Sequence, residues 1–221
     1  MIGPAPMKRI TAGATLAWRG HRQKPRRRPG RPLLAFMTDA QRTPDPAAAM
    51  TRLTAGTIVV FRHYDAPDRE TLGRRLARLS RIKGLIFVVA GDRRLARRLG
   101  AQGLHLPEGM VARRHRVAPS GDRWPVSAAA HDEWSARRAA NAGADLIFLS
   151  PVFPTGSHPE KKPLGLRRLA SVCRRLDTPV LALGGASPAT ARRVLNTGVA
   201  GIAGIGALPH LCRDPLGIHG S

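Results

Sequence analysis

The sequence predicts a single-domain α/β protein with the architecture of a (β/α)8, or TIM, barrel. Eight short, continuous apolar runs are typical of strands that are buried on both faces in a parallel sheet. Helical patterns lie between most of these runs, and this alternation favours a closed barrel. The alternative is an open doubly wound sheet, but no G-x-G-x-x-G motif follows the first strand. At 221 residues, the chain is long enough for one domain with a full core.

The first half of the predicted barrel alternates clearly. The strand at 33–39 is an apolar run that ends in an acid, and the helix at 44–56 has proline in its first turn and Gly56 as its stop. The run at 57–64 is β-branched and aromatic, which indicates a second strand. The helix at 66–84 is amphipathic, with leucines on one side and arginines on the side that we expect to face solvent. A strand at 84–91, a short helix at 92–100 and a strand with a loop at 103–109 complete this half.

The second half begins with its weakest part, residues 110–124, which we expect to hold one helical turn and an irregular connection. Gly143 is the expected stop of the helix at 131–143, and Ser187 is the expected cap of the helix at 187–198. The other predicted elements are strands at 125–131, 146–149, 178–185 and 199–208, and a helix at 164–176. Pro215 and Gly217 interrupt residues 210–221, so the last helix is expected to be truncated.

Residues 1–32 differ from the rest in composition. They contain nine Lys/Arg and no Asp/Glu, and KPRRRPGRP at 24–32 has no hydrophobic period, so we expect a basic, disordered extension before a barrel at 33–221. The segment lacks the compact apolar core of a secretory signal. Four interpretations remain: a mis-assigned start with Met7 or Met37 as the true one, a solvated tail, an arm that binds nucleic acid or an acidic surface, and an arginine-rich transit peptide.

The net charge of +23 and the pI near 11.9 are typical of proteins that bind nucleic acid. Two observations weaken that interpretation. Arginines such as Arg74, Arg75 and Arg78 recur on helices at positions that are expected to face solvent. The aromatic content is only 4%, so few side chains can stack on bases. No apolar run approaches the ~20 residues of a membrane span. The two cysteines, Cys173 and Cys212, form no motif, which favours free thiols and a cytoplasmic location over a disulfide.

The expected strand ends carry groups that suit a phosphate. The stretch 144–166 passes from a buried strand into a loop with hydroxyls and cations, strand seven ends in two glycines, and strand eight ends in small residues. Backbone amides near a helix start bind anions, and barrels often hold phosphate after strands seven and eight. We therefore predict a phosphate site from Thr155, Ser157, Gly185, Ile205 and Gly206.

The same segments resemble the thiamine phosphate synthase family and its close relative, the thiazole tautomerase. The resemblance is carried by GADLIFLSPVFPTGSHPEKKPLG at 143–165, VLALGGASPATARRVLNTGVAGIAGIGAL at 180–208 and GAQGLHL at 100–106. It spans roughly residues 33–208 and implies the barrel that the strand count predicts independently. It also implies a reaction in which an aminopyrimidine methyl pyrophosphate joins a thiazole phosphate and pyrophosphate leaves. Departure of pyrophosphate implies Mg2+ and cationic side chains that stabilise the developing charge.

The resemblance assigns roles to individual residues. Arg62 matches the arginine that binds pyrophosphate, and His158 stands at the position of a pyrophosphate-binding lysine, with Lys161 and Lys162 nearby. Ser127, placed after strand five, matches a serine on the pyrimidine side. The family has two hydroxyl residues in the loop that follows strand six, and this chain keeps both, as Thr155 and Ser157.

Several positions depart from the family pattern. Val60 replaces the glutamine that contacts the pyrimidine, Tyr64 stands where the family has a lysine, and Ala90 replaces an asparagine. The metal-binding acids of the family correspond to Gly91 and Met110. The nearest acids, Asp92 and Glu108, are the candidate magnesium ligands in this chain.

We therefore predict a synthase-type transferase that acts on small phosphorylated substrates, and we keep three alternatives. One is an impaired relative that only binds a phosphorylated ligand. Another is a tautomerase-like protein, although Pro151 stands at the catalytic histidine position and neither His131 nor His158 matches it. The third is a binder of nucleic acid or an acidic partner. The oligomeric state is left open.

Overall fold

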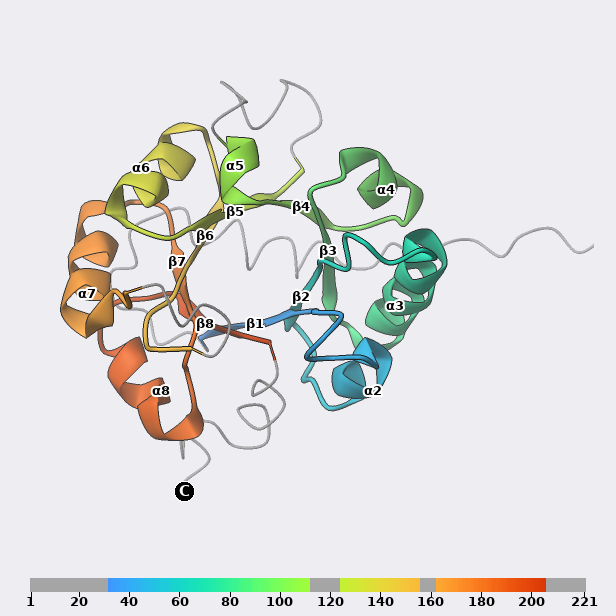
Figure 1. Cartoon of the computed structure of the whole chain (residues 1–221), viewed down its shortest axis with the longest axis horizontal. Coiled ribbons are helices and arrows are strands. Elements are labelled where there is room, and N and C mark those ends of the chain that lie inside the picture. Colours follow the sequence, from blue (N-terminus) through green and yellow to red (C-terminus); the bar gives the residue numbers. More distant parts are fainter. Residues whose placement is uncertain (1–31, 112–123, 156–161, 206–221) are drawn as a thin grey trace, which may run out of the picture.

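The computed structural model describes residues 32–111, 124–155 and 162–205, which form a closed barrel of eight parallel strands (Figure 1). Each strand pairs with its neighbours in sequence, and β1 closes the ring against β8. The predicted barrel is confirmed, and the open doubly wound sheet is wrong. The strands are β1 (Leu33–Met37), β2 (Ile58–Phe61), β3 (Ile86–Ala90), β4 (Gly103–Leu106), β5 (Val126–Ala130), β6 (Leu146–Leu149), β7 (Val180–Leu183) and β8 (Gly201–Gly204).

Helices surround the barrel in Figure 1, and in the described part of the chain one follows each of the first seven strands. They are α2 (Pro46–Thr51), α3 (Arg69–Lys83), α4 (Arg93–Arg98), α5 (Glu108–Val111), α6 (Glu133–Asn141), α7 (Gly165–Arg175) and α8 (Pro188–Leu195). On α3, Arg74, Arg75 and Arg78 are exposed, as the sequence predicts. Within the described ranges, no helix has both the length and the apolar character needed to cross a membrane.

The core has two parts, because successive side chains of a strand point to opposite faces. Inward side chains such as Val60, Val88 and Phe148 fill the barrel, while outward ones such as Phe61 and Phe87 pack under the helices. Both faces of the strands are therefore apolar, which explains why the strands appear as continuous apolar runs in the sequence.

Most helix ends follow the predicted signals. Gly84 ends α3 in the left-handed conformation, and Ser187 forms a capping box at the start of α8. The predicted end of α2 at Gly56 is wrong, because the helix ends at Thr51. Leu53 packs into the core, and the Gly56 N–H donates to the Gly84 carbonyl oxygen at 2.8 Å, so the chain leaves the helical path before Gly56.

Some predictions concern residues outside the described ranges. They include the basic extension, apart from Pro32, the truncated helix at 210–221, and Cys212. Cys173 on α7 is a free thiol, and burial raises its pKa to about 11.

Candidate active site

The carboxyl ends of the eight parallel strands meet at one end of the barrel, which we call the carboxyl rim. Active sites of this architecture lie at that end. Among the described residues, three sets of polar groups lie there. One surrounds Arg62 after β2, and one surrounds Glu108 and His131 after β4 and β5. The third belongs to the loop after β6, which carries Thr155 and packs on the end of β7.

Arg62, the predicted pyrophosphate cation, directly follows β2 and is held in place by the end of β1. Its Nε donates to the Thr38 carbonyl oxygen at 2.9 Å, and its Nη2 pairs with the Asp39 carboxylate at 2.8 Å. Burial lowers the pKa of Arg62, and the nearby Asp39 carboxylate opposes that shift. These two contacts use only part of the guanidinium's set of N–H donors, so Arg62 is a fixed cation that can still bind an anion.

The end of β3 has no carboxylate at Gly91, one of the two positions where the resemblance implies a metal ligand. Gly91 has φ +75°, and a Cβ built on it would lie 3.2 Å from Cε1 of Tyr64 and 3.7 Å from Sδ of Met110. Met110 is the second family position. Gly91 and Met110 are thus neighbours in space, and the Tyr64 ring and the Met110 thioether occupy the space beside Gly91.

Asp92, the first candidate magnesium ligand, is the N-cap of α4. One of its carboxylate oxygens accepts a hydrogen bond from the Leu95 N–H at 2.8 Å, and the other lies 3.9 Å from Nη1 of Arg69. The Arg69 guanidinium lies over the Tyr64 ring, 5.4 Å from its centroid, and donates to the Ala90 carbonyl oxygen at 2.7 Å. The Asp92 carboxylate is therefore engaged by α4 and Arg69.

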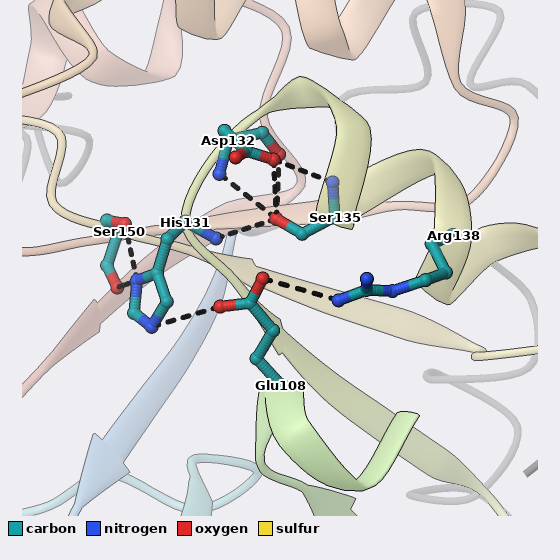
Figure 2. A network of polar contacts seen from close by, with 6 residues as sticks. All are labelled: Glu108, His131, Asp132, Ser135, Arg138 and Ser150. Atoms are coloured by element: carbon teal, nitrogen blue, oxygen red, sulfur yellow. Dashed lines mark hydrogen bonds and ion pairs between the residues drawn. The ribbon is translucent and has the colours of Figure 1, made fainter. Parts of the chain in front are cut away.

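Glu108, the second candidate ligand, belongs to the polar network shown in Figure 2. Its carboxylate lies 3.4 Å from Nη2 of Arg138 and 3.7 Å from Nε2 of His131. The Nδ1–H of His131 donates to the Ser150 carbonyl oxygen at 2.8 Å. Glu108 thus links α5 to α6 and to the ends of β5 and β6.

The same network fixes the start of α6. The Asp132 carboxylate accepts a hydrogen bond from the Ser135 N–H at 2.6 Å, and the Ser135 hydroxyl accepts one from the Asp132 N–H at 3.1 Å, which completes a capping box. The hydrogen bond from the Ser135 backbone is the main cause of the lowered pKa of Asp132. The His131 N–H also donates to the Ser135 hydroxyl, at 3.0 Å, so the histidine is held by both its backbone and its ring.

The predicted phosphate residues Thr155 and Gly185 lie together, because the loop after β6 packs on the end of β7. The Phe153 N–H donates to the Gly184 carbonyl oxygen at 3.2 Å. A Cβ on Gly184 would lie 3.1 Å from Cγ2 of Thr155, and one on Gly185 would lie 2.6 Å from Cβ of Phe153. Glycine at these two positions therefore permits the close approach that brings the Thr155 side chain to β7.

The other predicted phosphate residues are only partly described. Ile205, which follows β8, is half-buried and packs against the inner core. Ser157, His158 and Gly206 lie outside the described residues, so their roles stay predictions.

Ser127, the predicted pyrimidine contact, lies inside β5 rather than after it. Its hydroxyl is fully buried and lies 3.0 Å from Nδ1 of His105 on β4. Burial lowers the pKa of His105 to about 3, so this imidazole is neutral at ordinary pH. The contact lies inside the barrel and below the carboxyl rim, because the His105 ring packs edge-on against the inner Phe148 ring, with 5.0 Å between the centroids.

The carboxylates described at the rim do not fit the magnesium site that the resemblance implies. Mg2+ is usually bound by one or two carboxylates with near-octahedral geometry. Asp39 and Glu108 are paired with arginines, and Asp92 caps a helix. Glu108 and Met110 are two residues apart on α5, about 200° around the helix, so Glu108 points away from Gly91. Across residues 32–111, 124–155 and 162–205, no three His, Cys, Asp or Glu side chains gather into a possible metal site.

Two features of the rim were not predicted from the sequence: the Tyr64 ring against Gly91 and the network of His131. His131 stands between a predicted strand and a predicted helix, which is a signal that it lies at the rim. Tyr64 ends the predicted strand at 57–64, which is also a signal for the rim, but its approach to Gly91 could not be predicted, because it joins residues from two different strand ends.

Comparisons with known proteins agree with the fold and the motifs. A family model described as thiamine monophosphate synthase matches residues 34–208. The thiamine-phosphate synthase of Geobacillus kaustophilus is 30% identical over 185 residues, which cover 78% of this chain and 82% of that protein. The Pyrococcus furiosus enzyme of the same name is 32% identical over 180 residues, which cover 79% and 86%. A solved structure of thiamine phosphate pyrophosphorylase from Pyrococcus furiosus has a TM-score of 0.68 at 26% identity and covers 83% of this chain and 94% of its own.

Proposed function

The chain belongs to the thiamine monophosphate synthase family, and we propose that it is a transferase of the thiamine phosphate synthase type. It joins an aminopyrimidine methyl pyrophosphate to a thiazole phosphate. The carbon–oxygen bond of the pyrimidine substrate breaks, and its electron pair leaves with pyrophosphate. The thiazole nitrogen then donates its lone pair to the carbon. Both substrates are small phosphorylated molecules, and we propose a cytoplasmic location for the reaction.

The observation that carries this proposal is a fixed cation on the same rim as the loop of Thr155, the residue predicted to bind phosphate. Arg62 lies at the end of β2, and the loop with Thr155 packs on Gly185 at the end of β7. Both parts lie at the end of the barrel where active sites of this fold occur.

In this proposal, Arg62 stabilises the negative charge that develops on the departing pyrophosphate. Asp39 and the Thr38 carbonyl orient the guanidinium, so little reorganisation is needed during the reaction. His158 stays the predicted second donor.

The phosphate of the thiazole binds at the other part of the rim. The Thr155 hydroxyl and the backbone amide of Gly185 are its proposed donors, with Ser157 and Gly206 as further predicted contacts. The start of α8 follows Gly185 closely, and the positive end of a helix favours a bound anion.

A turnover assay tests the proposal. The purified full chain is incubated with both substrates, with and without Mg2+, and thiamine phosphate and pyrophosphate are quantified. We expect equal amounts of both products, and we expect Arg62→Ala to lower kcat by about 100-fold. Arg75→Ala is the control, because Arg75 is exposed on α3. No product above background in either condition would contradict the transferase, and binding of thiazole phosphate without turnover would indicate a ligand-binding relative instead.

A further inference from the structure

We infer that this chain binds the diphosphate group of its substrate through Arg62 and Tyr64 without Mg2+. The resemblance implies metal-binding carboxylates at Gly91 and Met110, and here the Tyr64 ring and the Met110 thioether lie at these positions instead. The identity of the ligand rests on the proposed function. The manner of binding rests on contacts at the ends of β1, β2 and β3 and in α5.

The backbone at Gly91 is unsuited to a carboxylate. Its φ of +75° lies in the left-handed region, which L side chains rarely adopt. A side chain at this position would also start 3.2 Å from Cε1 of Tyr64, closer than an ordinary van der Waals contact. Restoring an acid at Gly91 therefore requires movement of the Tyr64 ring.

The Tyr64 ring is itself held in place. The Arg69 guanidinium lies 5.4 Å from its centroid and is anchored to the Ala90 carbonyl oxygen at the end of β3. Tyr64 is still 47% exposed, so the residue remains partly open to a ligand at the carboxyl rim. A phenol hydroxyl donates to phosphate oxygens but is a poor ligand for Mg2+, which favours carboxylates, phosphates and water.

The nearby carboxylates already have partners. Asp39 pairs with Arg62 at 2.8 Å, and Asp92 caps α4 and lies 3.9 Å from Arg69. A magnesium ion on either carboxylate would compete with a partly buried arginine for the same negative charge, which is unfavourable. A diphosphate, in contrast, can use N–H donors of Arg62 that the Asp39 contact leaves free.

Calorimetric titration of the full chain with inorganic pyrophosphate tests this inference. The titration is done once in EDTA and once in excess MgCl2. We expect binding in EDTA, and equal or weaker binding in MgCl2, because Mg2+ sequesters free pyrophosphate. Binding that is at least about 10-fold tighter in MgCl2, or no binding in EDTA, would overturn the inference.

Two arginine variants separate the site from the general basic surface of a chain with net charge +23. Arg62→Ala should weaken binding in EDTA by at least about 10-fold, and the exposed-site control Arg75→Ala should leave it unchanged. Equal effects of both substitutions would show that pyrophosphate associates with the surface at large and would refute the inference.

A reconstructed site provides a second measurement. The triple variant Tyr64→Lys, Gly91→Asp and Met110→Asp restores the residue types that the resemblance implies, and it should bind pyrophosphate at least about 10-fold more tightly in MgCl2 than in EDTA. A folded triple variant without this gain would contradict the role given to Tyr64. If circular dichroism shows that the variant does not fold, the titrations of the unmodified chain decide. Because pyrophosphate binding requires no turnover, this inference and the transferase proposal can fail separately.

Discussion

Replacing Gly185 with alanine tests the packing that brings Thr155 to the carboxyl rim. Gly185 has φ +71°, and an alanine there carries a left-handed strain of about 1–2 kcal/mol. The new Cβ would also lie 2.6 Å from Cβ of Phe153, so the loop must shift, which adds about 1–3 kcal/mol. We expect the free energy of unfolding to fall by about 2–5 kcal/mol in total.

Gly56→Ala is the matched control for the strain. Gly56 has φ +83°, but a Cβ built on it meets no atom within 4 Å, so this variant should lose only about 1–2 kcal/mol. Urea unfolding of both variants gives the comparison, and a titration with thiazole phosphate should show weaker binding for Gly185→Ala alone. The reasoning is refuted if Gly185→Ala costs no more stability than Gly56→Ala.

Two further predictions concern stability. Because the pKa of His105 is about 3 in the fold and about 6.5 in the unfolded chain, only the unfolded chain gains this proton as the pH falls from 6.5 towards 3. The free energy of unfolding should therefore fall by up to about 1.4 kcal/mol per pH unit in this range. His105→Gln should reduce that slope in urea unfolding. An unchanged slope would contradict the lowered pKa of His105. Asp132→Ala removes a side-chain cap of α6 and should lower the free energy of unfolding by about 1–2 kcal/mol. Asp68 is the N-cap of α3 but makes no side-chain hydrogen bond there, so Asp68→Ala should lower it by less than about 0.5 kcal/mol. Thermal unfolding of both variants gives the comparison, and equal losses would contradict the capping argument.

The strands were predictable because their apolar runs depend on local sequence alone. Every strand of a closed parallel barrel is buried on both faces, and turn residues interrupt each run. The end of α2 was not predictable in the same way. The helix stops at Thr51 because Leu53 enters the core and Gly56 bonds to Gly84, and these contacts join distant parts of the chain.

The candidate site was predictable in position but not in contacts. Arg62, Thr155 and Gly185 could be placed because each stands close to the end of a strand, and strand ends share one rim. The arginine partners of Asp92 and Glu108, which are Arg69 and Arg138, could not be derived, since packing between distant parts of the chain brings them close.

A crystal structure of the full chain with Mg2+, pyrophosphate and thiazole phosphate tests the central claim most directly. We predict pyrophosphate on Arg62 beside Tyr64, the thiazole phosphate between Thr155 and Gly185, and no Mg2+ bound by a carboxylate of the chain. Either phosphate group bound away from the carboxyl rim, or Mg2+ held by Asp92 or Glu108, would contradict the account.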